Sequence, residues 1–140
     1  MNNSVEIVVF LLNEGEYCVE VNDVNSIVPY KNIPPKAELS AFSTIKINEK
    51  SVIFSDINKF LDLESDQITP NTRIILIESA DQFFAFPVAK IKEFVTLKDV
   101  QFEETDSQII PINKKYVSKM LKWGATYVGV LNCSNIFQNS

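Results

Sequence analysis

EIVVFLLNEGEYCVEV, residues 6–21, consists of two apolar runs joined by a short polar link at residues 13–15. Both runs are rich in residues that favour strands, and Asn-Glu-Gly is suited to a tight hairpin turn. A second stretch of this kind, RIILIESADQFFAFPV, occupies residues 73–88. The two stretches predict β-hairpins at corresponding points of a mostly β chain.

The rest of the chain extends this correspondence into an internal repeat. Residues 6–28 align with residues 73–95 without a gap when the sequence is shifted by 67 positions, and the apolar positions of the two stretches coincide. Residues 45–61 then lie on residues 121–137, a shift of 76. The larger shift predicts a longer connection in the second copy, between Thr96 and Ser118. We interpret the pattern as a duplicated unit of about five strands.

Strand patterns are far more frequent than helical ones. Helical spacing is found at Asp56–Leu61, where Asp56 is suited to an N-cap, and ambiguously at residues 114–122. Two such small units cannot each bury a large core, so we expect them to pack on a shared one. The predicted fold is all-β with one or two short helices. The segments with strand composition are Glu6–Leu12, Tyr17–Val21, Phe42–Ile47, Ser51–Phe54, Arg73–Glu78, Phe83–Val88 and Thr126–Leu131.

Composition excludes several classes of function. The 140 residues include 13 Lys and Arg against 18 Asp and Glu, a net charge of −5 that argues against a nucleic-acid partner. The chain contains no histidine, which removes Ser–His and Cys–His nucleophile pairs and the usual zinc sites. Its three glycines are not spaced to bind phosphate. We therefore expect no enzyme, no catalytic residues, no metal and no cofactor.

The location of the protein is predicted from its N-terminus and its cysteines. The apolar run at residues 7–12 is too short for a signal sequence or a membrane span, so no direct membrane insertion is expected. Cys18 and Cys133 are far apart in sequence and are interpreted as packing residues. Unpaired cysteines are typical of a reducing compartment. These features together predict a cytoplasmic protein.

Several stretches resemble CheW-like domains, the adaptor modules of bacterial chemosensory arrays. The resemblance covers about residues 5–137 of a single domain at 1–140. It implies two SH3-like five-stranded barrels packed on a shared hydrophobic core, the first at about residues 5–65 and the second at 72–137. The stretches that carry it are residues 6–12, 17–29, 72–78, 84–91 and 127–132.

The chain departs from the most recognisable motif of that family. Where the family has Arg-Gly in a turn, this chain has Asn48-Glu49, and Ser43 replaces an earlier Gly. Of the Asp-Leu that follows, the Asp is kept as Asp56. Asn cannot replace the planar charged donor of Arg, and Glu disfavours a turn with positive φ. The chain is identified as a divergent member.

The resemblance also implies two binding surfaces. An apolar groove for the helical hairpin at a receptor tip would include Val8, Val21, Val24 and Ile91; the alternative is that all four are ordinary core residues. A kinase-facing patch would include Phe42, Asn48 and Glu49; the alternative is a solvated hairpin tip.

The function implied by the resemblance is a non-catalytic chemotaxis adaptor. It would link chemoreceptor cytoplasmic tips to the regulatory domain of a CheA-type histidine kinase. Because the Arg-Gly turn is lost, the alternative is a divergent protein that competes in, or specialises, another chemosensory complex. A small ligand in an apolar cleft between the barrels is a further alternative.

Overall fold

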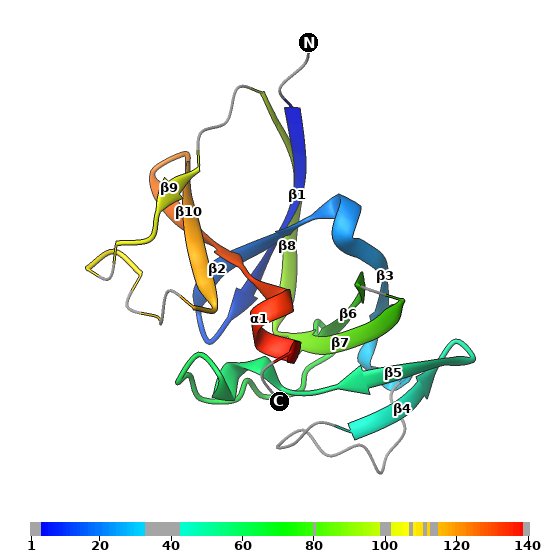
Figure 1. The fold of residues 1–140 in the computed structure, drawn as a ribbon. Helices are drawn as coiled ribbons and strands as arrows, with labels where there is room; N and C mark the ends of the chain where they lie inside the picture. Colours follow the sequence, from blue (N-terminus) through cyan, green and yellow to red (C-terminus); the bar gives the residue numbers. More distant parts are fainter. Residues whose placement is uncertain are drawn as a thin grey trace.

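In the described part of the chain, the fold consists of short strands, one α-helix and three 3-10 turns (Figure 1). The computed structural model describes residues 4–32, 43–79, 81–98, 102–106, 108–110, 112 and 115–138. The elements before residue 70 are β1 (Ser4–Leu12), β2 (Gly15–Glu20), η1 (Val21–Asp23), β3 (Val24–Pro29), η2 (Tyr30–Asn32), β4 (Ser43–Ile47), β5 (Lys50–Phe54) and η3 (Ile57–Lys59). The later elements are β6 (Arg73–Ser79), β7 (Gln82–Val88), β8 (Lys90–Lys98), β9 (Glu103–Glu104), β10 (Val117–Trp123), β11 (Thr126–Leu131) and α1 (Cys133–Gln138).

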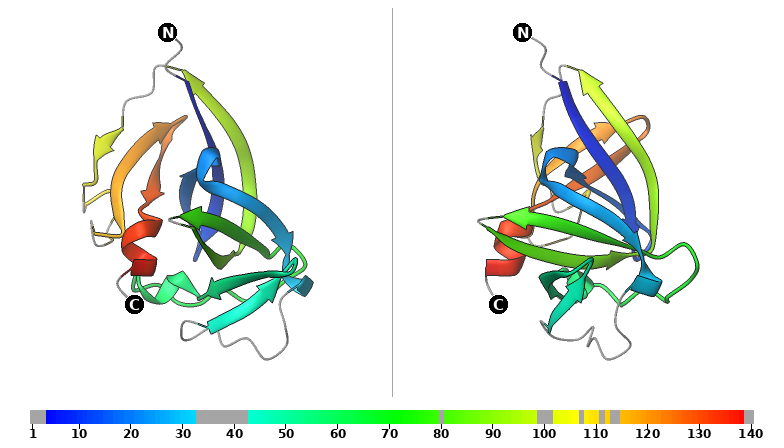
Figure 2. Two further views of the ribbon diagram at one scale, coloured as in Figure 1. Left: turned by 45° about the vertical axis from the view of Figure 1, so that its right-hand side comes forward. Right: turned by 90° about the vertical axis from the view of Figure 1, so that its right-hand side faces the viewer.

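The strands form two sheets, and each sheet combines strands from both halves of the chain. Sheet A has the order β8-β1-β2-β11-β10-β9, and sheet B has the order β3-β6-β7-β5-β4. The hairpin β1–β2 therefore lies among strands of the second half, and β6–β7 lies among strands of the first half (Figures 1 and 2). This corrects the assignment of one barrel to residues 5–65 and the other to 72–137. Those ranges are repeats in sequence, whereas in space they exchange their first hairpins.

The registers of the two sheets show that the halves are duplicates in structure. In sheet A, Tyr17 pairs with Gly129 in the parallel ladder between β2 and β11. In sheet B, the repeat-equivalent Phe84 pairs with Ile53 in the parallel ladder between β7 and β5. Both sheets also contain a bulge at the corresponding place, at Lys92 of β8 where it pairs with β1 and at Asn25 of β3 where it pairs with β6. The sequence repeat is thus confirmed residue by residue.

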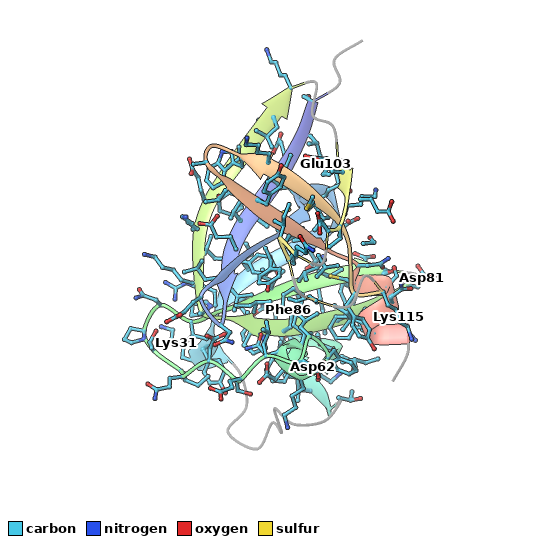
Figure 3. The ribbon with its side chains drawn as sticks, turned by 90° about the vertical axis from the view of Figure 1, so that its left-hand side faces the viewer. Lys31, Asp62, Asp81, Phe86, Glu103 and Lys115 are labelled. Atoms are coloured by element: carbon cyan, nitrogen blue, oxygen red, sulfur yellow. The ribbon has the colours of Figure 1, made fainter. Side chains whose placement is uncertain are left out.

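The exchanged hairpins are buried on both faces, which explains their continuous apolar sequences. On β1, Val8 and Phe10 point from one face of sheet A into a cluster between the two sheets. Ile7 and Val9 point from the other face of sheet A into a second cluster. Phe86, from β7, lies in the cluster between the sheets, at the centre of the molecule (Figure 3). We call this cluster the central core. Its buried members are Val8, Phe10, Leu12, Tyr17, Val19, Ile57, Leu61, Ile75, Ile77, Phe84, Phe86, Val88, Ile110, Ile112, Val117, Met120, Leu131, Ile136 and Phe137.

The predicted shared core is thereby confirmed, because the central core takes residues from both halves of the chain. Smaller clusters fill the interior of each sheet: Val28, Ile47, Val52, Phe54, Ile74, Leu76 and Ala85 in sheet B, and Ile7, Val9, Cys18, Leu121 and Val128 in sheet A.

Helical segments were predicted less well than strands. The Asp56 carboxylate accepts a hydrogen bond from the backbone N–H of Asn58 at 3.1 Å, so the predicted cap of η3 is confirmed. The ambiguous segment at residues 114–122 is mostly the strand β10, because its apolar side chains alternate toward two cores. The α-helix is instead α1, which occupies the repeat-equivalent place of η3. No helix in the described part of the chain is long and apolar enough to cross a membrane.

Both cysteines are packing residues, as expected from their sequence context. Cys18 is fully buried inside sheet A, and Cys133 is half-buried at the start of α1. Burial raises the pKa of each thiol to about 12, from an ordinary value of 9.0, with smaller contributions from Glu20 for Cys18 and from Asp23 for Cys133. Burial also raises the pKa of Tyr17 to about 12. All three groups are therefore protonated in the folded protein at neutral pH.

These shifts predict that the protein loses stability at alkaline pH. Between pH 9 and 12 the unfolded chain releases thiol protons that the folded chain keeps, so unfolding becomes more favourable as the pH rises. Each thiol contributes a slope of up to about 1.4 kcal/mol per pH unit in that range. Urea unfolding at a series of pH values measures the slope. Cys18→Ala should make it shallower, and an equal slope in that variant would contradict the assignment.

Candidate functional site

Two of the four apolar residues expected to line a receptor groove, Val24 and Ile91, lie on repeat-related edge strands. Val24 is on β3, at the edge of sheet B, and pairs with Ile77. Ile91 is on β8, at the edge of sheet A, and pairs with Phe10. Both Val24 and Ile91 are partly exposed and pack against the central core. The structure thus places equivalent apolar side chains on both sheets, beside the same core.

The other two residues differ from each other in exposure. Val21 begins η1 directly before β3 and is partly exposed. Val8 has no exposed surface and belongs to the central core. Val8 therefore supports the surface from below, as the core interpretation expected, and Val21, Val24 and Ile91 provide the accessible part. We call these three residues the edge-strand surface.

Phe94, which the sequence reasoning did not single out, lies near this surface. It is on β8, is 61% exposed and pairs with Val8. The repeat contained a signal for it, because a shift of 67 places Ile27 on Phe94 and therefore gives both residues the same position in their strands. The exposure of Phe94 could not be predicted from that correspondence.

The second expected surface is the turn between β4 and β5. Asn48 and Glu49 form its tip, and both are exposed. Their φ angles are 49° and 68°, the left-handed values of a type I′ hairpin turn. The expectation that Glu49 would disfavour such a turn is corrected: the turn forms, and Glu49 adopts the strained conformation. Phe42, the third residue of the expected patch, lies outside the described residues.

The strain at Glu49 predicts a stabilising substitution. Glu49→Gly should raise the free energy of unfolding by about 0.5–1 kcal/mol, because glycine adopts positive φ without a Cβ clash while adding some entropy to the unfolded chain. Chemical denaturation measures the change. The reverse control is Gly124→Ala, at φ 63° in the turn between β10 and β11, where open space leaves backbone strain as the cost. A destabilised Glu49→Gly protein would show that the Glu49 side chain makes a stabilising contact.

Next to this tip, Lys50 connects β5 to neighbouring strands of sheet B. Its Nζ donates a hydrogen bond to Asn25 Oδ1 at 3.0 Å and lies 4.9 Å from the centroid of the Phe83 ring. These contacts fix the base of the turn and leave its tip as an exposed polar projection. The tip has the geometry of either a solvated hairpin or a contact point for a partner.

A separate cavity of about 250 Å³ lies where β2, β6, β11 and α1 meet. Glu20, Asp23, Glu78 and Lys119 are among its lining residues, and none of the edge-strand surface residues is. Cys133 also lines it, and because burial raises the pKa of its thiol to about 12, that thiol is protonated at neutral pH. Both polar and apolar side chains line the cavity, so it differs from the purely apolar cleft considered for a small ligand.

The repeat-equivalent place in the first half is filled by the chain that follows η3. Asp66 from this segment accepts hydrogen bonds from the backbone N–H of Asn13 and from Asn58 Nδ2, both at 3.0 Å. Asn58, Asp66 and Val88 are among the residues that line the remaining space there, which is about 10 Å³. The described residues provide no corresponding segment for the larger cavity, and within them no group of three or more Asp, Glu or Cys side chains is arranged to hold a metal.

Comparison with known proteins identifies the family. The family model for the CheW-like domain matches residues 6–140. The chain belongs to the CheW-like domain family. The CheW-like resemblance seen in the sequence is therefore confirmed over nearly the whole chain. No curated protein matches the chain.

Fifteen solved chains match this CheW-like protein in structure. One is the scaffolding protein TtCheW from Thermoanaerobacter tengcongensis, with a TM-score of 0.81 and 21% sequence identity. The match covers 95% of this chain and 87% of that one. It confirms the predicted fold class, two SH3-like β subdomains on a shared core, with β9 as a sixth short strand in sheet A.

Proposed function

We propose that this CheW-like protein is a non-catalytic cytoplasmic adaptor that links chemoreceptor tips to the regulatory domain of a CheA-type histidine kinase. The observation that carries the proposal is the family match over residues 6–140. The description of the structural relative as a scaffolding protein supports the same role. The absence of histidine from the chain removes the commonest acid–base group of enzymes and is consistent with an adaptor.

The receptor tip would bind at the edge-strand surface. Val24 and Ile91 pack against the central core yet remain partly exposed, so they form a firm apolar surface that needs little ordering on binding. A helical hairpin can bury its apolar face on such a surface. Val8 would act indirectly, by holding Phe94 and the strands above it in place.

The kinase domain would bind at the tip of the β4–β5 turn, where Asn48 and Glu49 are exposed. Phe42 is kept in the proposed patch from the family resemblance. The second candidate function follows from the same residues, because a turn without Arg offers a partner neither its charge nor its planar donors. A protein with this change would compete in, or specialise, another chemosensory complex.

The test is size-exclusion chromatography of the protein with a chemosensory kinase regulatory domain from the same genome, with and without a receptor-tip fragment. Co-elution with both partners supports the adaptor. Co-elution with one partner alone favours the competing or specialised role. Co-elution with neither would remove both functions and leave the fold unaffected.

Substitutions in the same experiment separate the two surfaces. Asn48→Ala with Glu49→Ala should abolish co-elution with the kinase domain and leave receptor binding intact. The matched control is Asn13→Ala with Glu14→Ala, the same dipeptide with φ angles of 45° and 70° at the tip of another hairpin. Val24→Asp should abolish receptor binding and leave co-elution with the kinase domain intact, because it places a charge on the apolar surface. Kinase binding that survives the double substitution at the β4–β5 turn would refute the proposed patch.

A further inference from the structure

The cavity where β2, β6, β11 and α1 meet has an apolar interior and an acidic rim. Its volume is about 250 Å³, and its buried lining residues are Val19, Ile77, Phe84 and Leu131. The exposed charged residues that line it are Glu20, Asp23, Glu78 and Lys119. We call Glu20, Asp23 and Glu78 the rim carboxylates. A bound molecule would therefore contact apolar surface at depth and negative charge at the rim.

The rim carboxylates form no ion pair with any basic residue that the structure describes. Lys119 is the basic residue of the lining, but its Nζ lies 5.3 Å from the centroid of the Phe102 ring, and Phe102 packs against the cluster inside sheet A. The ion pair found in the described part of the chain lies elsewhere, on sheet A. After burial, the charge of Asp23 is the other cause of the raised pKa of the Cys133 thiol, so this carboxylate acts inside the cavity. The site therefore favours a cation.

The repeat shows that the fold does not require these carboxylates. A shift of 67 places neutral or basic residues at the equivalent positions: Pro87 for Glu20, Lys90 for Asp23 and Leu11 for Glu78. The other copy of the repeat thus folds without an acidic side chain at any of the three positions. Like charges around one cavity also repel one another. The rim carboxylates are therefore explained by binding rather than by folding.

The equivalent place in the first half shows what kind of occupant the fold accommodates. Asn58 and Pro87 line that place. Their repeat equivalents, Ser134 and Glu20, line the cavity, so the two places correspond. In the first half the chain that follows η3 fills the space, and its Asp66 carboxylate accepts a hydrogen bond from Asn58 Nδ2 at 3.0 Å. The occupant there is a peptide segment anchored by one acidic side chain. Because the rim of the cavity is itself acidic, the anchoring side chain in the second half should be basic.

We propose that the cavity binds an arginine side chain from a peptide segment of a protein partner, an inference that does not depend on the adaptor function. The aliphatic part of arginine can pack on the apolar interior. Its guanidinium has five N–H donors for the rim carboxylates and for the hydroxyl oxygens of Ser79 and Ser118, which also line the cavity. The volume is below the roughly 300–1,000 Å³ of sites for drug-sized ligands, which favours a single side chain over a larger molecule.

The test is an NMR titration of the ¹⁵N-labelled protein with Nα-acetyl-arginine methylamide, which is one arginine residue with a peptide group on each side. Amide shifts should move at lining residues such as Ser118 and Ser134. The citrulline counterpart has the same shape without the charge and should bind about 10-fold more weakly. Propylguanidine has the charge without the peptide groups and should bind at least about threefold more weakly. Equal affinity for propylguanidine would assign the cavity to free small cations and contradict a peptide occupant.

A double substitution on the rim tests the carboxylates directly. Asp23→Asn with Glu78→Gln should reduce the affinity for the arginine derivative about 10-fold, to that of the citrulline derivative. The matched control is Glu6→Gln with Glu93→Gln, which changes the net charge equally at two exposed positions of sheet A outside the cavity lining and should alter the affinity by less than about twofold. Unchanged urea midpoints show that both variants fold. An arginine derivative that moves no lining amide, or that binds both double variants equally well, would overturn the proposal and leave the adaptor function standing.

Discussion

Residues 1–69 and 70–140, expressed as separate fragments, are each expected to be unfolded and to fold when they are mixed. The first fragment would keep β3 and the pair β4–β5 of sheet B without the strands β6 and β7 that lie between them. The second fragment would keep β8 and the pair β10–β11 of sheet A without β1 and β2. Neither could close a sheet, so the entropy of ordering the chain would not be offset.

Circular dichroism and amide NMR spectra of each fragment would measure this, followed by spectra of an equimolar mixture. The expected result is disordered fragments and a dispersed spectrum for the mixture. The cut falls in an exposed connection at Thr69 and Pro70, so it should not itself disturb either sheet. A fragment that unfolds cooperatively on its own would show that the halves are independent barrels and that the hairpins are not exchanged.

The second large effect is expected from Phe86→Ala, which should destabilise the protein by about 3–5 kcal/mol. Phe86 has no exposed surface, and its ring centroid lies 6.0 Å from that of Phe10 and 6.3 Å from that of Phe137. Its removal leaves a cavity where both halves of the chain meet. That loss is a large part of the 5–15 kcal/mol by which a domain is typically stable.

Urea unfolding followed through the fluorescence of Trp123, the single tryptophan of the chain, measures the loss. The matched control is Phe94→Ala, the same substitution at an exposed ring, which should change stability by less than about 0.5 kcal/mol. If Phe86→Ala lost as little stability as Phe94→Ala, the central core would not depend on Phe86.

The sequence predicted the strands best where both faces are buried. Residues 6–12 and 73–78 are almost continuously apolar, because alternate side chains enter two different cores. Strands β3 and β8 were not predicted separately, since β8 is largely exposed, β3 is mostly only partly buried, and a bulge interrupts the alternation of both. Helix α1 was also missed, although a shift of 76 places it on η3. The six residues Cys133–Gln138 are too few to show a helical period.

The exchange of hairpins could not be predicted from the sequence at all. Because β3 and β8 are equivalent in the repeat, local patterns do not say which of them pairs with β1. The exposure of the candidate site residues was equally hard to predict from the sequence. Val24, Ile91 and Val8 were all expected on an accessible surface, but only Val24 and Ile91 are partly exposed, whereas Val8 is fully buried. Which face of a strand is covered depends on the sheet opposite, and that is a tertiary property.

The hairpin exchange also determines when the protein can fold as it leaves the ribosome. Hairpin β1–β2 is complete at Glu20, but its parallel neighbour β11 begins at Thr126. At a translation rate of about 5–20 residues per second, roughly 5–20 s pass between the synthesis of the hairpin and that of β11. During this time Phe10 and the other core side chains of the hairpin have no permanent cover, and they are natural targets for ribosome-associated chaperones. Productive folding is therefore delayed until translation has almost ended.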